Sequence, residues 1–103
     1  MRNSIVGIRY AKSLLSLAIE RGELEQCFKD MELVANTCSN SKDLSIMLKS
    51  PLIKTDKKLS ILNAIFGKEV GTLSNGFIDI ITKKKRGIYL EDISNSFLSL
   101  YKK

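Results

Sequence analysis

Apolar residues recur every three or four positions along most of this chain, a spacing that predicts amphipathic helices. The segment richest in them is residues 9–22, RYAKSLLSLAIERG, where apolar side chains form two adjacent stripes. One stripe consists of Ala11, Leu15 and Ala18, continued by Ile8 or Ile19. The other consists of Tyr10, Leu14 and Leu17. Because the protein's own core needs only one stripe, we predict that the first packs inside and that the second binds a helix of another protein.

Capping signals divide the sequence that follows into further helices. Gly22 ends the first helix, and the acidic residues after it favour the first turn of a second one. The apolar stripe of the second helix consists of Leu24, Cys27, Phe28, Met31, Val34, Ala35 and Cys38. Asp30 and the other charged residues of this segment fall outside the stripe, in water. A single narrow stripe after a tight turn predicts an antiparallel hairpin with the first helix.

Two shorter helices are predicted next. Ser41 is a candidate N-cap for the third helix, which Ser50-Pro51 stops because proline has no backbone N–H to donate. Its inner face consists of Leu44, Met47 and Leu48. Thr55 or Asp56 caps the fourth helix, which ends at Gly67. Its inner face consists of Leu59, Leu62, Ile65 and Phe66.

The fifth helix, capped by Thr72 or Ser74, is the second element with surplus apolar surface. Its core stripe consists of Leu73, Phe77, Ile80 and Ile81. Ile78 lies about 100° from Phe77 around the helix and therefore falls off the centre of that stripe. Gly76 lies early in this helix, where it either costs about 1 kcal/mol relative to Ala or permits the close approach of another backbone.

A basic run at residues 83–86 ends the fifth helix, where positive charge complements the helix dipole, and Gly87 permits the reversal into a sixth. The stripe of the sixth helix consists of Leu90, Ile93, Phe97, Leu100 and Tyr101. No helix stop follows at Lys102 or Lys103, so we expect the sequence to continue in a longer protein. No segment alternates as a strand does, and the predicted fold class is therefore an all-α bundle of six helices.

Length and composition fit a single soluble domain that spans residues 1–103. A chain of this size can bury roughly 60 to 70% of its unfolded surface. The longest uncharged run near the N-terminus, residues 13–19, is far shorter than the roughly 20 residues of a membrane span. We find no secretion signal and expect a cytosolic bacterial protein. The net charge of +6 would suit an acidic partner, nucleic acid or an anionic membrane.

The sequence contains no arrangement of side chains that an enzyme or a metal site requires, since it lacks His and its acidic residues are scattered over solvent faces. Cys27 and Cys38 are eleven positions apart on one helix, about 16 Å along its axis, which is too far for a disulfide. We therefore expect reduced thiols in the core. With no His, two distant Cys cannot form a zinc site, and a nucleophilic Ser or Cys would have no His as its base. No Gly-rich phosphate loop occurs either, so we expect no enzyme, no cofactor and no metal.

Residues 9–22 resemble the opening of the delta subunit of the F-type ATP synthase, which in mitochondria is called the oligomycin sensitivity conferral protein. The likeness continues through residues 48–62, LKSPLIKTDKKLSIL, where the family has a helix end, a Ser-Pro type break and a Lys-containing helix start. It also covers residues 83–93, KKKRGIYLEDI, where the family has a basic turn before its last bundle helix. The order and spacing of the three segments extend the resemblance over the whole chain.

The resemblance implies the N-terminal six-helix bundle of a stator subunit, without the family's second domain, which meets stalk subunit b. Such a bundle grips the amphipathic N-terminal helix of an alpha subunit at the top of the catalytic head. It thereby holds the head against the torque of the proton-driven rotor. The location implied is peripheral, on the cytoplasmic side of a bacterial inner membrane.

In the family, the partner's groove lies between the first and fifth helices, the two elements with surplus apolar surface here. Carried over to this sequence, the groove residues are Tyr10, Ser13, Leu14, Leu17, Ile78, Ile81 and Lys85. Ser13 departs from the small apolar Ala that the family often shows, although its hydroxyl can bond back to the preceding turn. Tyr10 is the best single anchor, because it offers both aromatic area and a polar tip.

The alternative function is that of a small basic helical domain that binds nucleic acid. Its contacts would be Lys54, Lys57, Lys58 and the run at residues 83–86. Both clusters are expected at helix termini, where complementarity with the helix dipole explains them, and no aromatic residues lie among them as stacking platforms. We therefore prefer the stator function.

Overall fold

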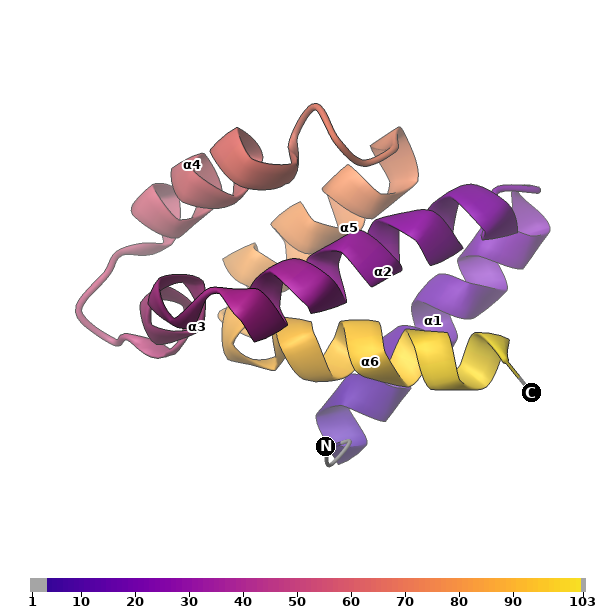
Figure 1. Cartoon of the computed structure of the whole chain (residues 1–103), viewed down its shortest axis with the longest axis horizontal. Coiled ribbons are helices and arrows are strands. Elements are labelled where there is room, and N and C mark those ends of the chain that lie inside the picture. The colour runs from indigo at the N-terminus through magenta and orange to yellow at the C-terminus, as the bar shows by residue number, and fades with distance from the viewer. Residues whose placement is uncertain (1–3, 103) are drawn as a thin grey trace.

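The computed structural model describes residues 4–102, which form six α-helices in the order that the sequence predicts (Figure 1). The elements are α1 (Ile5–Glu20), α2 (Leu24–Asn40), α3 (Lys42–Lys49), α4 (Thr55–Phe66), α5 (Thr72–Lys83), the short 3-10 helix η1 (Gly87–Tyr89) and α6 (Leu90–Tyr101). No strand occurs in this part of the chain, so the predicted all-α bundle is confirmed.

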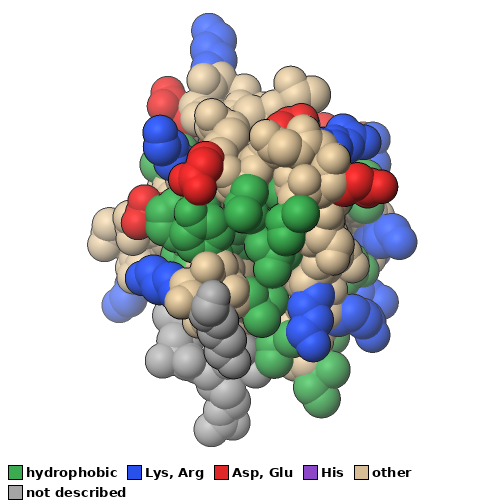
Figure 2. All heavy atoms as spheres, turned by 90° about the vertical axis from the view of Figure 1, so that its right-hand side faces the viewer, with side chains coloured by type: hydrophobic (Ala, Val, Ile, Leu, Met, Phe, Trp, Pro, Cys, Tyr) green, Lys and Arg blue, Asp and Glu red, His purple; other side chains and the backbone are tan. Residues whose placement is uncertain are grey.

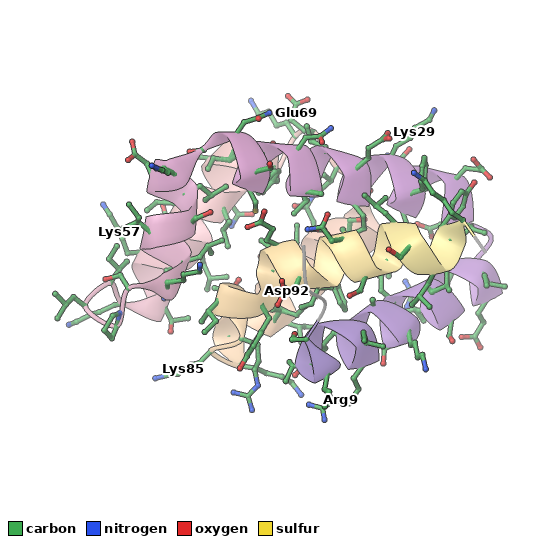
Figure 3. All side chains as sticks on the ribbon, turned by 60° about the horizontal axis from the view of Figure 1, so that its bottom comes forward. Arg9, Lys29, Lys57, Glu69, Lys85 and Asp92 are labelled. Carbon is green, nitrogen blue, oxygen red and sulfur yellow. The ribbon has the colours of Figure 1, made fainter. Side chains whose placement is uncertain are left out.

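The last helix, α6, lies between α1 and α2 and is the main packing partner of both (Figure 3). The approach of α1 to α6 is close, since a Cβ atom added to Gly7 would lie 3.0 Å from the Cβ of Asp92. The tight turn predicted after α1 is present, and Gly22 there has the left-handed φ of 69° that favours glycine. The two helices joined by this turn contact each other less than each contacts α6.

The inward face of α1 differs from the predicted one by one position. Ala11, Leu14 and Ala18 are fully buried, together with Gly7, whereas Leu15 is only half-buried. Leu14 therefore belongs to the core stripe and not to the partner's stripe, which is a correction. The buried positions 7, 11, 14 and 18 follow the alternating spacing of four and three that suits close packing on a single neighbouring helix. A helical wheel alone cannot tell which of two adjacent apolar stripes that neighbour covers.

The predicted inner face of α2 is confirmed for five residues, Cys27, Met31, Val34, Ala35 and Cys38, all of which are buried. Asp30 was expected in water, but only 2% of its surface is exposed. Its Oδ1 accepts a hydrogen bond from Gln26 Nε2 at 2.8 Å, and its Oδ2 accepts one from the backbone N–H of Gly71 at 3.0 Å. The carboxylate is buried because it bonds an N–H at the start of α5, a partner that lies 41 positions away in the sequence.

The predicted caps of α5 are also wrong, because Asp30 of α2 bonds the N–H at the start of this helix. Gly71 is the N-cap, and neither Thr72 nor Ser74 caps the helix. Ser74 is fully buried, and its hydroxyl donates to Cys27 Sγ at 3.7 Å. Asp30 of α2 thus supplies from another helix the carboxylate that a local capping residue would otherwise provide.

The third and fourth helices follow the prediction more closely. Ser41 is the N-cap of α3, which ends at Lys49 before Ser50-Pro51, and the inner face of α3 is confirmed. The fourth helix ends at Gly67 as predicted, but its N-cap is Lys54 without a side-chain hydrogen bond, so neither Thr55 nor Asp56 caps it. Leu62 and Phe66 are buried, whereas Ile65 is 37% exposed, which corrects its predicted inward position. Across residues 4–102, no helix is long and apolar enough to span a bilayer.

Candidate functional site

An apolar groove runs between α1 and α5 and has a volume of about 220 Å³. It is lined by Leu17, Arg21, Thr72, Leu73, Gly76, Phe77 and Ile80. The end of α1 that carries Leu17 and Arg21 lies on the right-hand side of Figure 1. Figure 2 shows this side of the molecule, on which hydrophobic side chains gather among charged ones. The groove itself has an apolar lining with Arg21 at one end, a combination typical of a protein-binding surface.

An aromatic pair joins the two walls of the groove. The rings of Tyr10 on α1 and Phe77 on α5 meet edge to face, with centroids 6.5 Å apart and planes at 71°. The guanidinium carbon of Arg9 lies 5.8 Å from the centroid of the Tyr10 ring, within the range of a cation–π contact. Both aromatic residues are half-buried. They therefore support each other and leave part of their surface open to a ligand.

The sequence-predicted groove residues separate into two groups. Leu17 is half-buried and lines the groove, whereas Tyr10 is half-buried and contacts Phe77 of the groove wall without lining the groove itself. Ser13 is exposed on α1, and Lys85 is exposed beyond the far end of α5. The exposed fractions of Leu14, Ile78 and Ile81 are 0%, 3% and 1%, respectively. These three side chains are part of the core and present no surface to a partner helix, which corrects their predicted place in the groove.

The fifth helix is rotated relative to the prediction: Leu73 and Ile81 are buried as predicted, but Phe77 and Ile80 turn outward and Ile78 turns inward. Its buried residues are Leu73, Ser74, Ile78, Ile81 and Thr82. Phe77 is half-buried and Ile80 is 54% exposed, although both were predicted in the core. The pattern missed this because Ser74 and Thr82 face inward with their hydroxyls bonded, Thr82 to the carbonyl of Ile78 at 2.8 Å. Counting only apolar residues therefore misplaces the buried stripe.

Gly76 lines the groove in the middle of the exposed face of α5. A Cβ atom added there would meet nothing within 4 Å, so within the described residues no other segment approaches this position. Among the described residues, Gly76 therefore does not serve to let another backbone segment approach α5. The absence of a side chain nevertheless leaves the backbone of α5 open to a ligand in the groove.

A second hollow, of about 530 Å³, lies where the α3–α4 loop faces the end of α5. Its lining consists of Lys49, Ser50, Pro51, Ile53, Lys54, Thr55, Lys58, Thr82, Lys85, Gly87 and Ile88. We call it the basic hollow, because four of these residues are lysines. Lys57 and Lys85 lie toward the same end of the molecule in Figure 3. The fold thus brings together the two lysine clusters that are separate in the sequence.

Only one of these clusters suits the helix dipole. Lys83 lies in the last turn of α5, where positive charge is favourable. Lys54, Lys57 and Lys58 instead lie at the N-terminus of α4, where positive charge opposes the dipole. Both lysine clusters were attributed, from the sequence, to favourable interactions with helix dipoles. This explanation is wrong for the cluster on α4.

Both cysteines are buried free thiols, as predicted. Burial raises the pKa of the Cys38 thiol to about 12, and it also raises the pKa of Cys27, against a smaller opposite effect of the hydrogen bond from Ser74. Thiolates are the nucleophilic and metal-binding forms, and these two groups stay protonated at neutral pH. Residues 4–102 contain no cluster of three or more His, Cys, Asp or Glu residues arranged to hold a metal ion.

Comparison with known proteins gives a match over nearly the whole chain. Residues 6–103 match the family model described as ATP synthase delta (OSCP) subunit. The chain is 40% identical over 100 residues to ATP synthase subunit delta of Chlorobaculum parvum, which covers 97% of this chain and 55% of the relative. It is 34% identical over 101 residues to the subunit of the same name from Clostridioides difficile, with coverages of 97% and 56%. The chain thus spans about half the length of the curated relatives that it matches.

The fold is also similar to that of a chain in the cryo-EM structure of the Toxoplasma gondii mitochondrial ATP synthase hexamer. The TM-score is 0.82 at 23% sequence identity, and the similarity covers 91% of this chain and 53% of the other. At this level of identity the likeness concerns the fold alone.

Proposed function

Because this chain belongs to the ATP synthase delta (OSCP) subunit family, we propose that it is a non-catalytic stator component that binds the amphipathic N-terminal helix of an alpha subunit in the α1–α5 groove. The resemblance of residues 9–22, 48–62 and 83–93 to this family is confirmed by the family match. The chain corresponds to about the N-terminal half of its relatives. In this proposal, contact with stalk subunit b falls to the half of the relatives that this chain does not cover, as the family resemblance implies.

The observation that carries the proposal is the uncovered apolar surface of the groove. Ile80 is 54% exposed, and Leu17 and Phe77 beside it are only half-buried. A partner helix with apolar residues at i, i+3, i+4 and i+7 would bury these side chains along one stripe. Burial of apolar area contributes about 25 cal/mol per Å², so this contact would be a main source of affinity.

The walls of the groove also supply orientation. Arg21 at one end offers a guanidinium that can pair with a carboxylate of the partner. Gly76 places no side chain between the partner and the α5 backbone, and it therefore permits a short distance between the two helices. Tyr10, supported from the side by Phe77, combines aromatic contact with a hydroxyl that can reach a polar group at the rim.

This mode of binding suits a structural task. A stator must resist torque without changing chemically, which calls for a stable bundle whose groove walls are held in place by the core. The two helices that form the groove each have a buried stripe on their inner side, Leu14 on α1 and Ile78 on α5 being examples. The outer apolar residues can thus bind a partner while the inner ones keep the bundle folded.

The proposal is tested by titrating the chain with a labelled peptide of the alpha subunit's N-terminal helix from the same organism, followed by fluorescence anisotropy. We expect saturable binding that Ile80→Asp or Phe77→Asp weakens by at least about tenfold, because either change places a charge in an apolar contact. Tyr10→Asp should weaken it as well.

The matched control is Ile46→Asp on α3, which introduces the same charge at a residue that is 63% exposed and outside the groove. It should change the affinity by less than about twofold. The absence of saturable binding, or an equal loss in Ile46→Asp, would refute the groove assignment.

A further inference from the structure

The basic hollow gathers four lysines from three separate segments around one concave surface. Lys49 comes from the end of α3, Lys54 and Lys58 from the start of α4, and Lys85 from the turn after α5. Among the described residues, its lining contains no Asp, Glu or aromatic side chain. Four positive charges thus share one hollow without a neutralising partner in its wall.

The arrangement is costly for the protein's own helices. Lysines at the N-terminus of α4 oppose the helix dipole, and no side chain caps that terminus. Lys85 has a φ of 63°, a left-handed conformation that costs a residue with a Cβ about 1 kcal/mol or more. The left-handed φ of Lys85 belongs to the backbone motif that ends α5, at a position where glycine would fit without strain. The lysines of α4 gain nothing from the helix dipole, so helix stability does not explain why these amines gather around one hollow.

The chemistry of the hollow defines its ligand class. Its volume of about 530 Å³ falls within the range of about 300 to 1,000 Å³ that is usual for small-molecule sites. Lysine amines and the hydroxyls of Ser50 and Thr55 are donors suited to phosphoryl oxygens. The absence of aromatic residues from the lining disfavours a stacked nucleobase.

We propose that the basic hollow binds a compact anion with two or more phosphoryl charges, either a free small molecule or the headgroup of an anionic lipid. Lys58 is the fixed part of this site, because its Nζ donates to the carbonyl of Leu48 at 3.0 Å and has two further hydrogens to donate. Lys49, Lys54 and Lys85 are exposed and can converge on the anion from its sides. This proposal is independent of the groove, which lies along the other end of α5.

The test uses sodium pyrophosphate as the probe and ¹⁵N-labelled chain, with backbone amide shifts recorded at low and at moderate salt. We expect saturable shifts confined to the α3–α4 loop, the first turn of α4 and the turn after α5. Lys58→Gln should raise the apparent Kd by about tenfold, which corresponds to the loss of one charge-assisted hydrogen bond. Lys54→Gln should act in the same direction.

The matched control is Lys29→Gln, which removes the same charge from an exposed position on α2 away from the hollow (Figure 3). An equal rise in the Kd for pyrophosphate in this control would overturn the proposal, and so would amide shift changes spread over all helices that carry lysines. Either result would mean that pyrophosphate binds through non-specific charge attraction.

A second arm distinguishes the two sources of the phosphoryl group. Co-sedimentation with phosphatidylglycerol vesicles that is lost in Lys58→Gln but kept in Lys29→Gln would assign the site to a lipid headgroup. Pyrophosphate binding without vesicle binding would assign it to a free anion. Tighter, Lys58-dependent binding of duplex DNA or of an acidic peptide than of either phosphoryl probe would overturn the proposal in favour of a macromolecular partner.

Discussion

The two ends of α5 are held by different means. At its N-terminal end, the backbone N–H of Gly71 donates to the buried Asp30 of α2, and the hydroxyl of Ser74 donates to Cys27, also of α2. The side-chain amide of Asn75 adds bonds to carbonyls of the preceding turn, those of Gly67 and Val70. This end is therefore fixed by side chains, two of which come from another helix.

The C-terminal end of α5 is closed by its own backbone. The N–H of Lys85 donates to the carbonyl of Thr82 at 3.0 Å, and that of Arg86 donates to the carbonyl of Ile81 at 2.9 Å. The same paired arrangement ends α1, where Gly22 takes the left-handed position that Lys85 takes in α5.

The difference shows what sets the rotation of α5. A local backbone motif can end a helix, but it does not select the face that points inward. The bonds from α2 at the N-terminal end do so, because they require Ser74 to face the core and thereby turn Phe77 and Ile80 toward the groove. The apolar lining of the groove therefore depends on the bond between the carboxylate of Asp30 and the start of α5.

The largest expected effect tests this rotation directly. Ile78→Ala should lower the free energy of unfolding by about 3 kcal/mol, because Ile78 is 3% exposed and its truncation leaves a cavity. Ile80→Ala should cost only about 0.5 kcal/mol, because its side chain is largely in water. Urea unfolding followed by circular dichroism measures both. The reverse ranking would mean that α5 has the orientation predicted from the apolar pattern.

The bond that holds the N-terminal end should come next. Asp30→Ala should destabilise the chain by roughly 2 kcal/mol, because it leaves the partly buried N–H of Gly71 without its acceptor. Asp30→Asn retains an acceptor and should cost less. Glu32→Ala, at an exposed position of the same helix, should stay within about 0.5 kcal/mol. If Asp30→Ala matched Glu32→Ala in a urea titration, the link between α2 and α5 would have no energetic weight.

Alkaline pH should weaken α2, the helix that holds this end. The pKa of Cys38 is about 12 in the folded chain against 9.0 when unperturbed, so its contribution to stability is complete below pH 9 and is lost as the pH rises toward 12. At pH 10 this loss is on the order of 1 kcal/mol. The raised pKa of Cys27, which accepts the bond from Ser74, adds a change in the same direction.

The measurement is the free energy of unfolding between pH 8 and about pH 10.5, in the wild type and in Cys38→Ala. The variant should lose the Cys38 part of the alkaline decline and keep the smaller part that belongs to Cys27. An unchanged decline in Cys38→Ala would show that other groups cause it.

The smallest effect concerns the C-terminal end. Lys85→Gly should stabilise the chain by about 1 kcal/mol, because glycine adopts the left-handed conformation without a Cβ clash. Gly22→Lys at the equivalent position of α1 should destabilise by a similar amount, since an added Cβ there meets no other atom within 4 Å and only the backbone strain counts. Thermal unfolding of the two variants gives the comparison. Equal and opposite changes in the unfolding temperature would confirm that the C-terminal ends of α1 and α5 are both closed by local backbone motifs.

Local signals in the sequence were sufficient for the positions at which helices end. Gly22 and Ser50-Pro51 stop their helices where predicted, because these residues free or restrict the backbone irrespective of its surroundings. The fourth helix also ends at Gly67 as predicted, although the φ of Gly67 is −53°, an ordinary helical value. Ser41 was likewise predicted as a cap, since its hydroxyl bonds an N–H only three residues away. Asp30 could not be predicted as the partner of Gly71, because nothing local connects two positions so far apart in the chain.

The apolar groove lies between α1 and α5, the two helices in which the pattern found surplus apolar surface. Leu17 lines it, and Tyr10 contacts Phe77 of its wall. Phe77 and Ile80 were missed in favour of Ile78 and Ile81, because two inward hydroxyl residues on α5 satisfy their own hydrogen bonds and leave no mark in the apolar periodicity.

Six helices, their order and most of their ends could be predicted from the amino-acid pattern, since hydrophobic periodicity and helix termination are local properties of the chain. Its family also followed from three short segments in order. The side of α1 and of α5 that faces the core, and the meeting of two distant lysine clusters in one hollow, became known from the folded molecule. Contacts with other helices, above all Asp30 on Gly71 and α6 on α1, set the rotation of a helix about its axis, and no local pattern specifies those contacts.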